Sequence, residues 1–172
     1  MQELLSSYNS TLTIDGTGLR IGIIVARFNS HITSPMLDLA YSELTRLGVD
    51  TDNIRIVSVP GSYELASTAQ AMLASGYYDA LICFGCVMKG ETRHDILVGD
   101  AAAHGLQRVA LDTHVPIIFG VICAETLQQA EERIYRGTEC AHSAVELACT
   151  FQRLKVESQL TTSQQQSSLA AR

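Results

Sequence analysis

The segment Lys89–His94 (KGETRH) carries side chains that could bind an anion and move a proton. Gly90 removes side-chain bulk where the chain is predicted to turn into a helix, and Thr92 places a hydroxyl beside the exposed N–H groups of the first turn. Such N–H groups and the helix dipole favour a bound phosphate. His94 lies in the same turn, where the positive helix end favours a neutral imidazole that can accept a proton. Two simpler readings stay open, with Thr92 as a plain N-cap and His94 as a surface histidine.

Aromatic and carboxylate side chains stand in two further segments, 27–29 (RFN) and 60–64 (PGSYE). Phe28 and Tyr63 offer flat apolar faces to a planar ring, and Glu64 can accept hydrogen bonds from hydroxyl groups. Taken singly, Phe28 could cap a core, and Glu64 could merely begin a helix. Two aromatic residues in successive segments make a purely structural role for them less satisfactory.

Each of these segments directly follows an apolar run rich in isoleucine and valine, and Ala124–Thr126 follows a fourth. Continuous runs of this kind are typical of strands covered on both faces, and helical patterns separate them. The order predicts an α/β fold, a three-layer α/β/α sandwich around a parallel sheet of about four strands. Ligand sites in such folds lie at the carboxyl ends of the strands, so the polar segments should meet at one edge. The predicted strands are 20–26, 54–60, 80–88 and 116–123.

Helix start and stop residues punctuate the stretches between the strands. The first helix is predicted to begin at Pro35, with Thr33 or Ser34 as its N-cap, and to end at Gly48. The other predicted helices are 64–76, 92–111, 126–137 and 138–156. We expect a single domain over residues 16–156, preceded by an N-terminal arm (1–15) and followed by a disordered tail rich in Ser, Gln and Thr (157–172).

Composition limits the classes of partner. The formal net charge of -6 argues against nucleic-acid binding, which needs a basic surface. No apolar run approaches the roughly 20 residues that cross a bilayer, and the N-terminus lacks the pattern of a secretion signal, so we expect a cytoplasmic protein without membrane contact. Five cysteines, an odd number, favour reduced thiols. Cys83 and Cys86 form a C-x-x-C, but they do not open a helix, which argues against a redox pair, and no metal-ligand spacing is present.

Four motifs, in this order, resemble the lumazine synthase family over about Gly18 to Phe151, within the flavodoxin-like sandwiches. The combination of GETRH, the preceding VPGSYEL and the following FGV is specific to this family. The motifs are ARFN (26–29), VPGSYEL (59–65), GCVMKGETRHDILV (85–98) and PIIFGVICAETLQQAEER (116–133).

The resemblance implies an enzyme that condenses 5-amino-6-(D-ribitylamino)uracil with 3,4-dihydroxy-2-butanone 4-phosphate to 6,7-dimethyl-8-ribityllumazine, with release of phosphate and water. It implies no cofactor and no metal. The acid/base group would be His94. The phosphate would be bound by Glu91, Thr92 and Arg133. The pyrimidine would be bound by Phe28, Ser62, Tyr63, Glu64, Cys86, Val87, Met88 and Phe119.

The resemblance also implies assembly into a homopentamer or a shell of about 60 subunits, with each site shared between neighbouring chains. Phe119 and Arg133 would then come from the adjacent chain. The sequence departs from many members in the short segment between Arg133 and Arg136, which influences how pentamers meet, and Cys86 is a less usual residue at its position. The choice between pentamer and shell stays open.

Two other functions share this fold or assembly. A pentameric riboflavin synthase of the archaeal type handles no phosphate, so the GET segment argues against it. A scaffold without catalysis would have no use for an anion site with a basic group beside it. A nucleotide-binding oxidoreductase is disfavoured because no G-x-G-x-x-G follows the first strand.

Overall fold

The computed structural model describes residues 14–170, with side chains described through residue 159. The strands are β1 (Ile21–Ala26), β2 (Ile54–Val59), β3 (Ala80–Met88) and β4 (Ile117–Ala124). The α-helices are α2 (Ser30–Arg46), α3 (Leu65–Leu73), α4 (His94–Thr113), α5 (Leu127–Glu131) and α6 (Arg136–Ala170). Short 3-10 turns, η1 (Thr51–Asn53) and η2 (Ser62–Glu64), precede β2 and α3.

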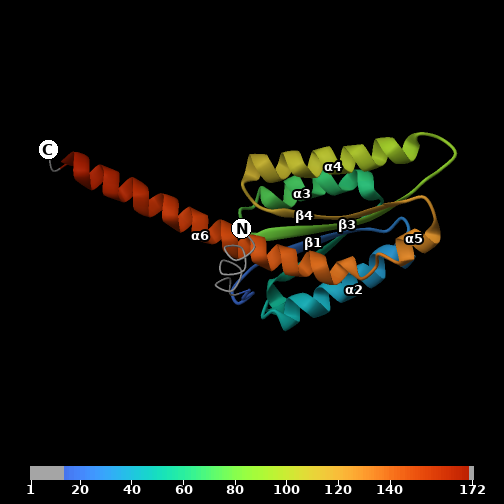
Figure 1. Ribbon diagram of the computed structural model, residues 1–172, viewed down its shortest axis with the longest axis horizontal. Coiled ribbons are helices and arrows are strands. Elements are labelled where there is room, and N and C mark those ends of the chain that lie inside the picture. The colour runs from blue at the N-terminus through green and yellow to red at the C-terminus, as the bar shows by residue number, and fades with distance from the viewer. Residues whose placement is uncertain (1–13, 171–172) are drawn as a thin grey trace, which may run out of the picture.

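The strands form one parallel sheet in the order β2-β1-β3-β4. Helices α2 and α6 cover one face of the sheet, and α3 and α4 cover the other (Figure 1). This arrangement confirms the predicted three-layer α/β/α sandwich. The chain passes from β1 to β2 on one side and from β2 to β3 on the other, so the strand order reverses between β1 and β3. In open α/β sheets such a switch point is the usual position of a ligand site.

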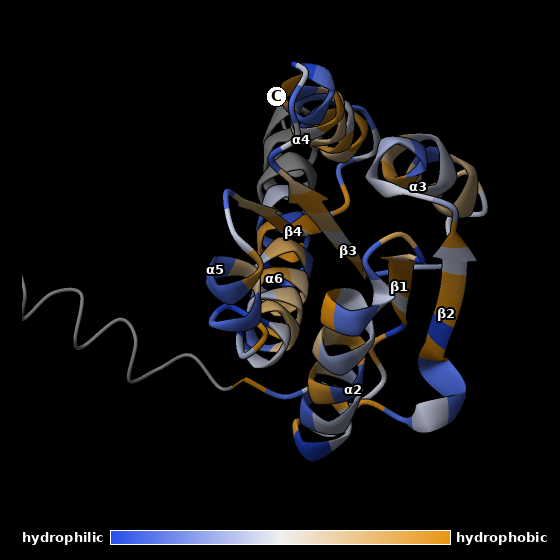
Figure 2. Cartoon of the chain, turned by 90° about the vertical axis from the view of Figure 1, so that its right-hand side faces the viewer, coloured by the Kyte–Doolittle hydropathy of each residue, from blue (hydrophilic) through white to orange (hydrophobic). Residues whose placement is uncertain are grey.

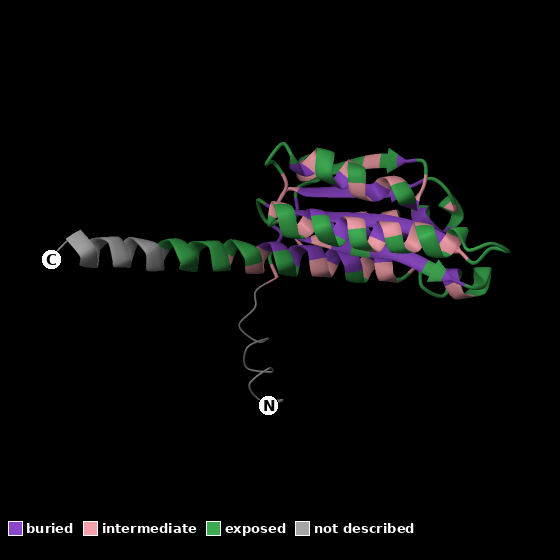
Figure 3. Cartoon of the chain, turned by 90° about the horizontal axis from the view of Figure 1, so that it is seen from above, coloured by how far each residue is buried: buried purple, intermediate pink, exposed green. Residues whose placement is uncertain are grey.

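Alternation along the central strands builds two apolar cores, one on each face of the sheet. In β1, Ile21, Ile23 and Val25 pack toward α2 and α6, while Ile24 and Ala26 pack toward α3 and α4. All six β1 residues are buried, which explains the continuous apolar run in the sequence. The strands are largely apolar in Figure 2, and Figure 3 shows the buried sheet between helices with exposed outer faces.

Helix α2 begins five residues earlier than the sequence analysis predicts, so Thr33 or Ser34 as an N-cap before Pro35 is wrong. The N-cap is Asn29, whose backbone carbonyl accepts hydrogen bonds from Ile32 and Thr33 at 2.9 and 3.2 Å. Thr33 is fully buried, and its hydroxyl donates to the carbonyl of Ala26 at 2.8 Å. Tertiary contacts at the end of β1 therefore extend the helix backward past the proline.

The chain from Thr126 onward also differs from prediction. Helix α5 ends at Glu131, whereas the sequence analysis carries it to residue 137; the intervening residues form tight turns instead. A Cβ at Gly137 would lie 2.3 Å from the backbone oxygen of Met36, so this glycine lets α6 begin close against α2.

Helix α6 continues to Ala170, beyond the predicted end near Val156, and projects away from the domain (Figure 1). No glycine or proline interrupts residues 157–170, so no residue there stops the helix. Disorder of this tail in solution stays a prediction, as does the division at residues 16 and 156. The predicted N-terminal arm lies outside the described residues, apart from Ile14 and Asp15.

Neither a membrane span nor a metal cluster is found among the described residues. No helix there is long and apolar enough to cross a bilayer. No three His, Cys, Asp or Glu side chains in the same part of the chain come together as metal ligands.

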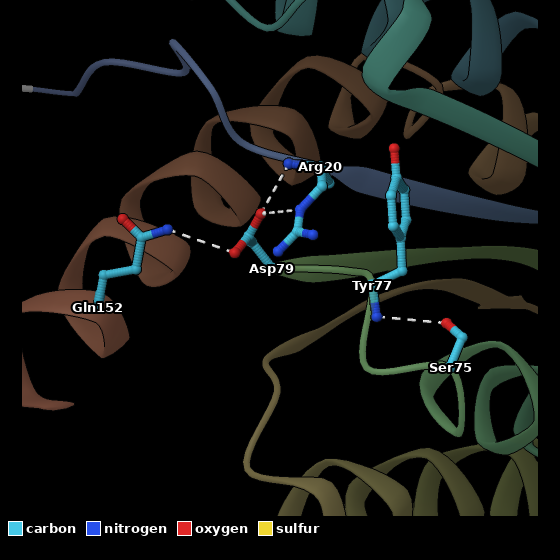
Figure 4. A network of polar contacts seen from close by, with 5 residues as sticks. All are labelled: Arg20, Ser75, Tyr77, Asp79 and Gln152. Carbon is cyan, nitrogen blue, oxygen red and sulfur yellow. Dashed lines mark hydrogen bonds and ion pairs between the residues drawn. The ribbon is translucent and has the colours of Figure 1, made fainter.

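A polar network ties α6 to the sheet at the edge where the strands begin (Figure 4). Asp79 Oδ2 accepts hydrogen bonds from Arg20 N at 2.8 Å and from Arg20 Nε at 3.3 Å. Asp79 Oδ1 accepts one from Gln152 Nε2 at 3.3 Å. The Arg20 guanidinium also lies 4.8 Å from the ring centroid of Tyr77. These contacts stabilise the edge where the strands begin, whereas the polar segments that follow β1, β2 and β3 lie at the carboxyl edge.

A carboxylate at the α2–α6 interface predicts a pH dependence of stability. Glu43 accepts hydrogen bonds from Arg46 at 2.6 and 2.8 Å, and its Oε1 lies 3.0 Å from His142 Nε2. The Arg46 hydrogen bonds hold the pKa of Glu43 below its ordinary value of 4.5. Because its pKa is lower in the folded state, Glu43 stabilises the protein at pH values above 4.5. This stabilisation is lost as the pH falls through the pKa of Glu43 in the folded state.

We therefore expect Glu43→Gln to lower the free energy of unfolding at neutral pH by about 1–3 kcal/mol. The difference from the wild type should shrink as the pH falls below about 4.5. Urea unfolding at a series of pH values measures both. Exposed Asp112, paired with Arg108 on α4, offers Asp112→Asn as a control with little effect. A constant difference at all pH values would contradict the assignment.

Candidate active site

A hollow of about 490 Å³ opens at the carboxyl edge of the sheet, at the β1–β3 switch point. Its volume suits a small organic ligand. All of the polar segments that follow β1, β2 and β3 contribute to its wall, as the parallel sheet predicts. The lining residues are Phe28, Pro60, Gly61, Ser62, Tyr63, Glu64, Cys86, Val87, Met88, Gly90, Thr92, His94, Asp95 and Val98.

Two aromatic rings border the hollow without being packed into the protein. Phe28 is 71% exposed and Tyr63 is 64% exposed, so neither side chain is part of the core. Phe28 therefore does not cap the core, which was the alternative explanation for an aromatic residue after β1. Exposed rings at the rim of a hollow are available to cover a planar ligand.

Ser62 is buried in the η2 turn, where its side chain lies against Gly85 of β3. A Cβ at Gly85 would lie 2.4 Å from the Ser62 hydroxyl oxygen, so only glycine at position 85 lets the η2 turn approach β3 this closely. The neighbouring Glu64 accepts a hydrogen bond from the backbone N–H of Gly61 at 2.8 Å. Glu64 thus stabilises the turn and also faces the hollow, where a carboxylate has remaining capacity to accept hydrogen bonds.

The side of the hollow where the sequence predicts a bound anion, which we call the anion side, is formed where the chain enters α4. The helix begins at His94, and the Thr92 hydroxyl oxygen accepts a hydrogen bond from the His94 backbone N–H at 3.4 Å. Gly90, Thr92 and His94 all line the hollow, whereas Glu91 does not. A hydroxyl, a helix N-terminus and an imidazole therefore lie together within reach of one ligand.

The two cysteines of the C-x-x-C lie on opposite faces of β3. Cys83 packs in the core beneath α3 and α4, and Cys86 packs in the core beneath α2 and α6. Burial raises the pKa of the Cys86 thiol to about 11 and the pKa of the Cys83 thiol still further. Because the two side chains point to opposite faces of the sheet, they cannot form a disulfide with each other while β3 is part of this sheet. Cys86 contributes to the hollow as part of the β3 wall.

Two of the predicted site residues lie elsewhere on the chain. Phe119 on β4 is 38% exposed and lines a second hollow, of about 550 Å³, between β4 and α4. Arg133 follows α5, and its Nη1 donates to the carbonyl of Gln129 at 2.6 Å. Gln129 lines the second hollow, and Arg133 lines neither. One chain by itself therefore does not bring Phe119 and Arg133 to the first hollow.

The sequence analysis assigned no role to Asp95 and Val98, which also line the first hollow. Val98 lies one helical turn beyond His94 on α4, so the helical repeat was the available signal for it. Asp95 directly follows His94, and no spacing pattern pointed to it. Asp95 borders the second hollow as well. Lys89, directly after β3, forms an ion pair with Glu125, with 2.9 Å between Lys89 Nζ and Glu125 Oε1.

Comparison with known proteins gives one consistent result. A sequence model described as 6,7-dimethyl-8-ribityllumazine synthase matches residues 18–152. A protein of that name from Cupriavidus necator is 43% identical over 136 residues, which cover 78% of this chain and 82% of the relative. Another of the same name, from Cupriavidus pinatubonensis, is 41% identical over 136 residues, covering 78% of this chain and 81% of the relative.

Proposed function

The chain belongs to the 6,7-dimethyl-8-ribityllumazine synthase family, and we propose that the hollow at the β1–β3 edge is where it joins its two substrates. The protein is a transferase of riboflavin biosynthesis. It condenses 5-amino-6-(D-ribitylamino)uracil with 3,4-dihydroxy-2-butanone 4-phosphate to 6,7-dimethyl-8-ribityllumazine, releasing phosphate and water. The observation that carries the proposal is the convergence of exposed aromatic rings and an anion site on one hollow.

The pyrimidine occupies the part of the hollow between β1, η2 and β3. Phe28 stacks on its ring, and Ser62, Tyr63 and Glu64 hold the ring and the ribityl chain. The β3 wall at Cys86, Val87 and Met88 offers backbone groups to the ring edge. The exposed faces of Phe28 and Tyr63 and the carboxylate of Glu64 support this placement, because a planar ring needs apolar faces and a polyol needs acceptors.

The ketone phosphate lies at the N-terminus of α4. Thr92 and the N–H groups of the first turn bind its phosphate, and Glu91 contributes from the preceding loop through its backbone. Arg133 supplies the cation. The hydroxyl of Thr92 and the start of α4 beside the hollow support this placement.

His94 stands between the two substrates as the acid/base group. The pyrimidine amine attacks the ketone carbon, and the carbinolamine loses water to form an imine. Loss of the proton from the neighbouring hydroxyl-bearing carbon expels phosphate and leaves an enol, which tautomerises to a ketone. The ribitylamino nitrogen attacks this ketone and closes the ring, releasing a second water. Each step moves a proton to or from a reacting atom, and His94 is the group at the hollow suited to this. Orientation of the two bound substrates supplies much of the remaining rate.

The site is completed by a neighbouring chain in a homopentamer or in a shell built from pentamers. Phe119 and Arg133 lie away from the first hollow of their own chain, on the side of β4 and α5. A ring in which this side of one chain meets the first hollow of the next brings both residues to the substrates. Phe119 would then cover the pyrimidine, and Arg133 would bind the phosphate.

A mixed-chain experiment tests the shared site. His94→Ala and Arg133→Ala chains, carrying different tags, are co-expressed and purified for oligomers that hold both. In a closed ring of randomly mixed chains, about a quarter of the interfaces pair an intact His94 with an intact Arg133. We expect lumazine absorbance and phosphate release to recover to about this fraction of the wild-type rate.

Two outcomes would contradict the proposal in different ways. A mixture no more active than the two separate variants would show that both residues act within one chain. A wild-type control that forms lumazine no faster than the uncatalysed condensation would overturn the activity itself. Sedimentation of the same samples distinguishes a pentamer from a larger shell.

A further inference from the structure

The turn that follows β1 is held to both of its neighbours in the sheet. On one side, the backbone N–H groups of Arg27 and Phe28 donate to the carbonyls of Val59 and Pro60 at 2.8 and 3.0 Å. On the other side, the Asn29 side chain donates from Nδ2 to the carbonyl of Cys86 at 2.9 Å. Asn29 is thus the residue that connects the β1 turn to the β3 wall of the hollow.

The hydrogen bond from Asn29 continues the sheet past the point where its ladder stops. Pairing between β1 and β3 ends at Val25 and Phe84, while β3 continues alongside β4 to Met88. The last residues of β3 therefore have a strand partner on one side only. On the other side, the Asn29 amide donates a hydrogen bond to the Cys86 carbonyl. Cys86 belongs to the part of β3 that forms the wall of the hollow.

Asn29 also has a backbone conformation that few residues adopt. Its φ and ψ of 60° and 41° place it in the left-handed region, where glycine, asparagine and aspartate are favoured. Its carbonyl accepts the first hydrogen bonds of α2. The left-handed turn sends the chain into the helix and leaves Phe28, the residue before it, exposed at the rim of the hollow. No core packing holds this ring, so its position depends on the turn.

The geometry points to Asn29 as a positioning residue for the pyrimidine: its amide fixes the distance between the Phe28 ring and the β3 backbone that together enclose the planar substrate. This inference rests on the pyrimidine subsite proposed above. Asn29 does not line the hollow and need not touch the substrate. The anion side at the start of α4 lies beyond its contacts, so its effect should be specific to one substrate.

Three substitutions separate the amide from the backbone conformation. Asn29→Gly and Asn29→Asp both permit the left-handed turn, but both remove the N–H donor. We expect each to raise the KM for the pyrimidine about two- to tenfold, the effect of losing one hydrogen bond. The KM for the ketone phosphate should not change. Asn29→Ala also strains the turn, and we expect it to lower the unfolding temperature in addition.

Steady-state kinetics with each substrate varied in turn, together with product binding and thermal unfolding, supplies the readouts. Asn53, before β2 at the opposite edge of the sheet, provides Asn53→Gly as the matched control. If Asn29→Gly has the same KM for the pyrimidine as the wild type, the positioning role is overturned. An equal rise in the KM values for both substrates would also overturn it. Either result leaves lumazine formation by the wild type intact, whereas no lumazine formation by the wild type would overturn the activity as well as this role.

Discussion

Replacing His94 with alanine is expected to lower kcat for lumazine formation by about 10²- to 10⁴-fold, the contribution of one general acid/base group. His94 is the first residue of α4 and lines the hollow beside Thr92. Its removal leaves the aromatic rim, the β3 wall and the helix N-terminus in place. We therefore expect both substrates still to bind and react slowly through orientation, with KM values close to those of the wild type.

His104 supplies the matched control for this substitution. It is an exposed histidine on the same helix, its Nδ1 lies 2.8 Å from the carbonyl oxygen of Asp100, and it lines neither hollow. His104→Ala should retain wild-type kinetics. A His94→Ala enzyme with unchanged kcat would remove His94 from the mechanism. A raised KM for both substrates with unchanged kcat would reassign it to binding.

Arg133→Ala is expected to raise the KM for the ketone phosphate about ten- to a hundredfold, since it removes charge-assisted hydrogen bonds to a phosphate. The KM for the pyrimidine should change little, because Arg133 has no proposed contact with the ring. In one chain its Nη1 donates to the Gln129 carbonyl at 2.6 Å. Binding the phosphate exchanges this neutral acceptor for an anion, which favours the bound arrangement.

Arg108 on α4 is the matched control for the loss of one positive charge. It is exposed and paired with Asp112 at 2.6 Å, so Arg108→Ala should leave both KM values unchanged. Arg133→Lys keeps the charge without the two-pronged geometry and should lie between alanine and the wild type. Equal rises in both KM values for Arg133→Ala would contradict a role specific to phosphate.

The strands and their shared edge could be predicted because burial on both faces leaves a direct mark on the sequence. β1 and β3 are apolar along almost their whole length, and their predicted positions agree with the structure to within about one residue. The polar residues that follow such strands can then be placed at one edge without further information. Phe28, Glu64 and Thr92 all line the hollow for this reason.

Helix boundaries were predicted less well, because tertiary contacts overrode the local signals. Pro35 is typical of a helix start, yet α2 begins at Ser30, since Asn29 and Thr33 are bound to the ends of β3 and β1. Thr126 caps α5, because its hydroxyl oxygen accepts a hydrogen bond from the Gln129 backbone N–H at 3.2 Å, but the helix it begins ends at Glu131. Close packing of Gly137 against Met36 sets where α6 begins.

The sequence by itself determined the order of strands and helices and the residue types at the carboxyl edge, because hydrophobic periodicity and helix start signals act over neighbouring residues. The tertiary structure alone decided which side chains share one hollow. It separated Phe119 and Arg133 from Phe28 and His94, and it brought the Asn29 amide to the Cys86 carbonyl. Distances between strands that are far apart in the chain depend on sheet order and packing, which no local pattern encodes.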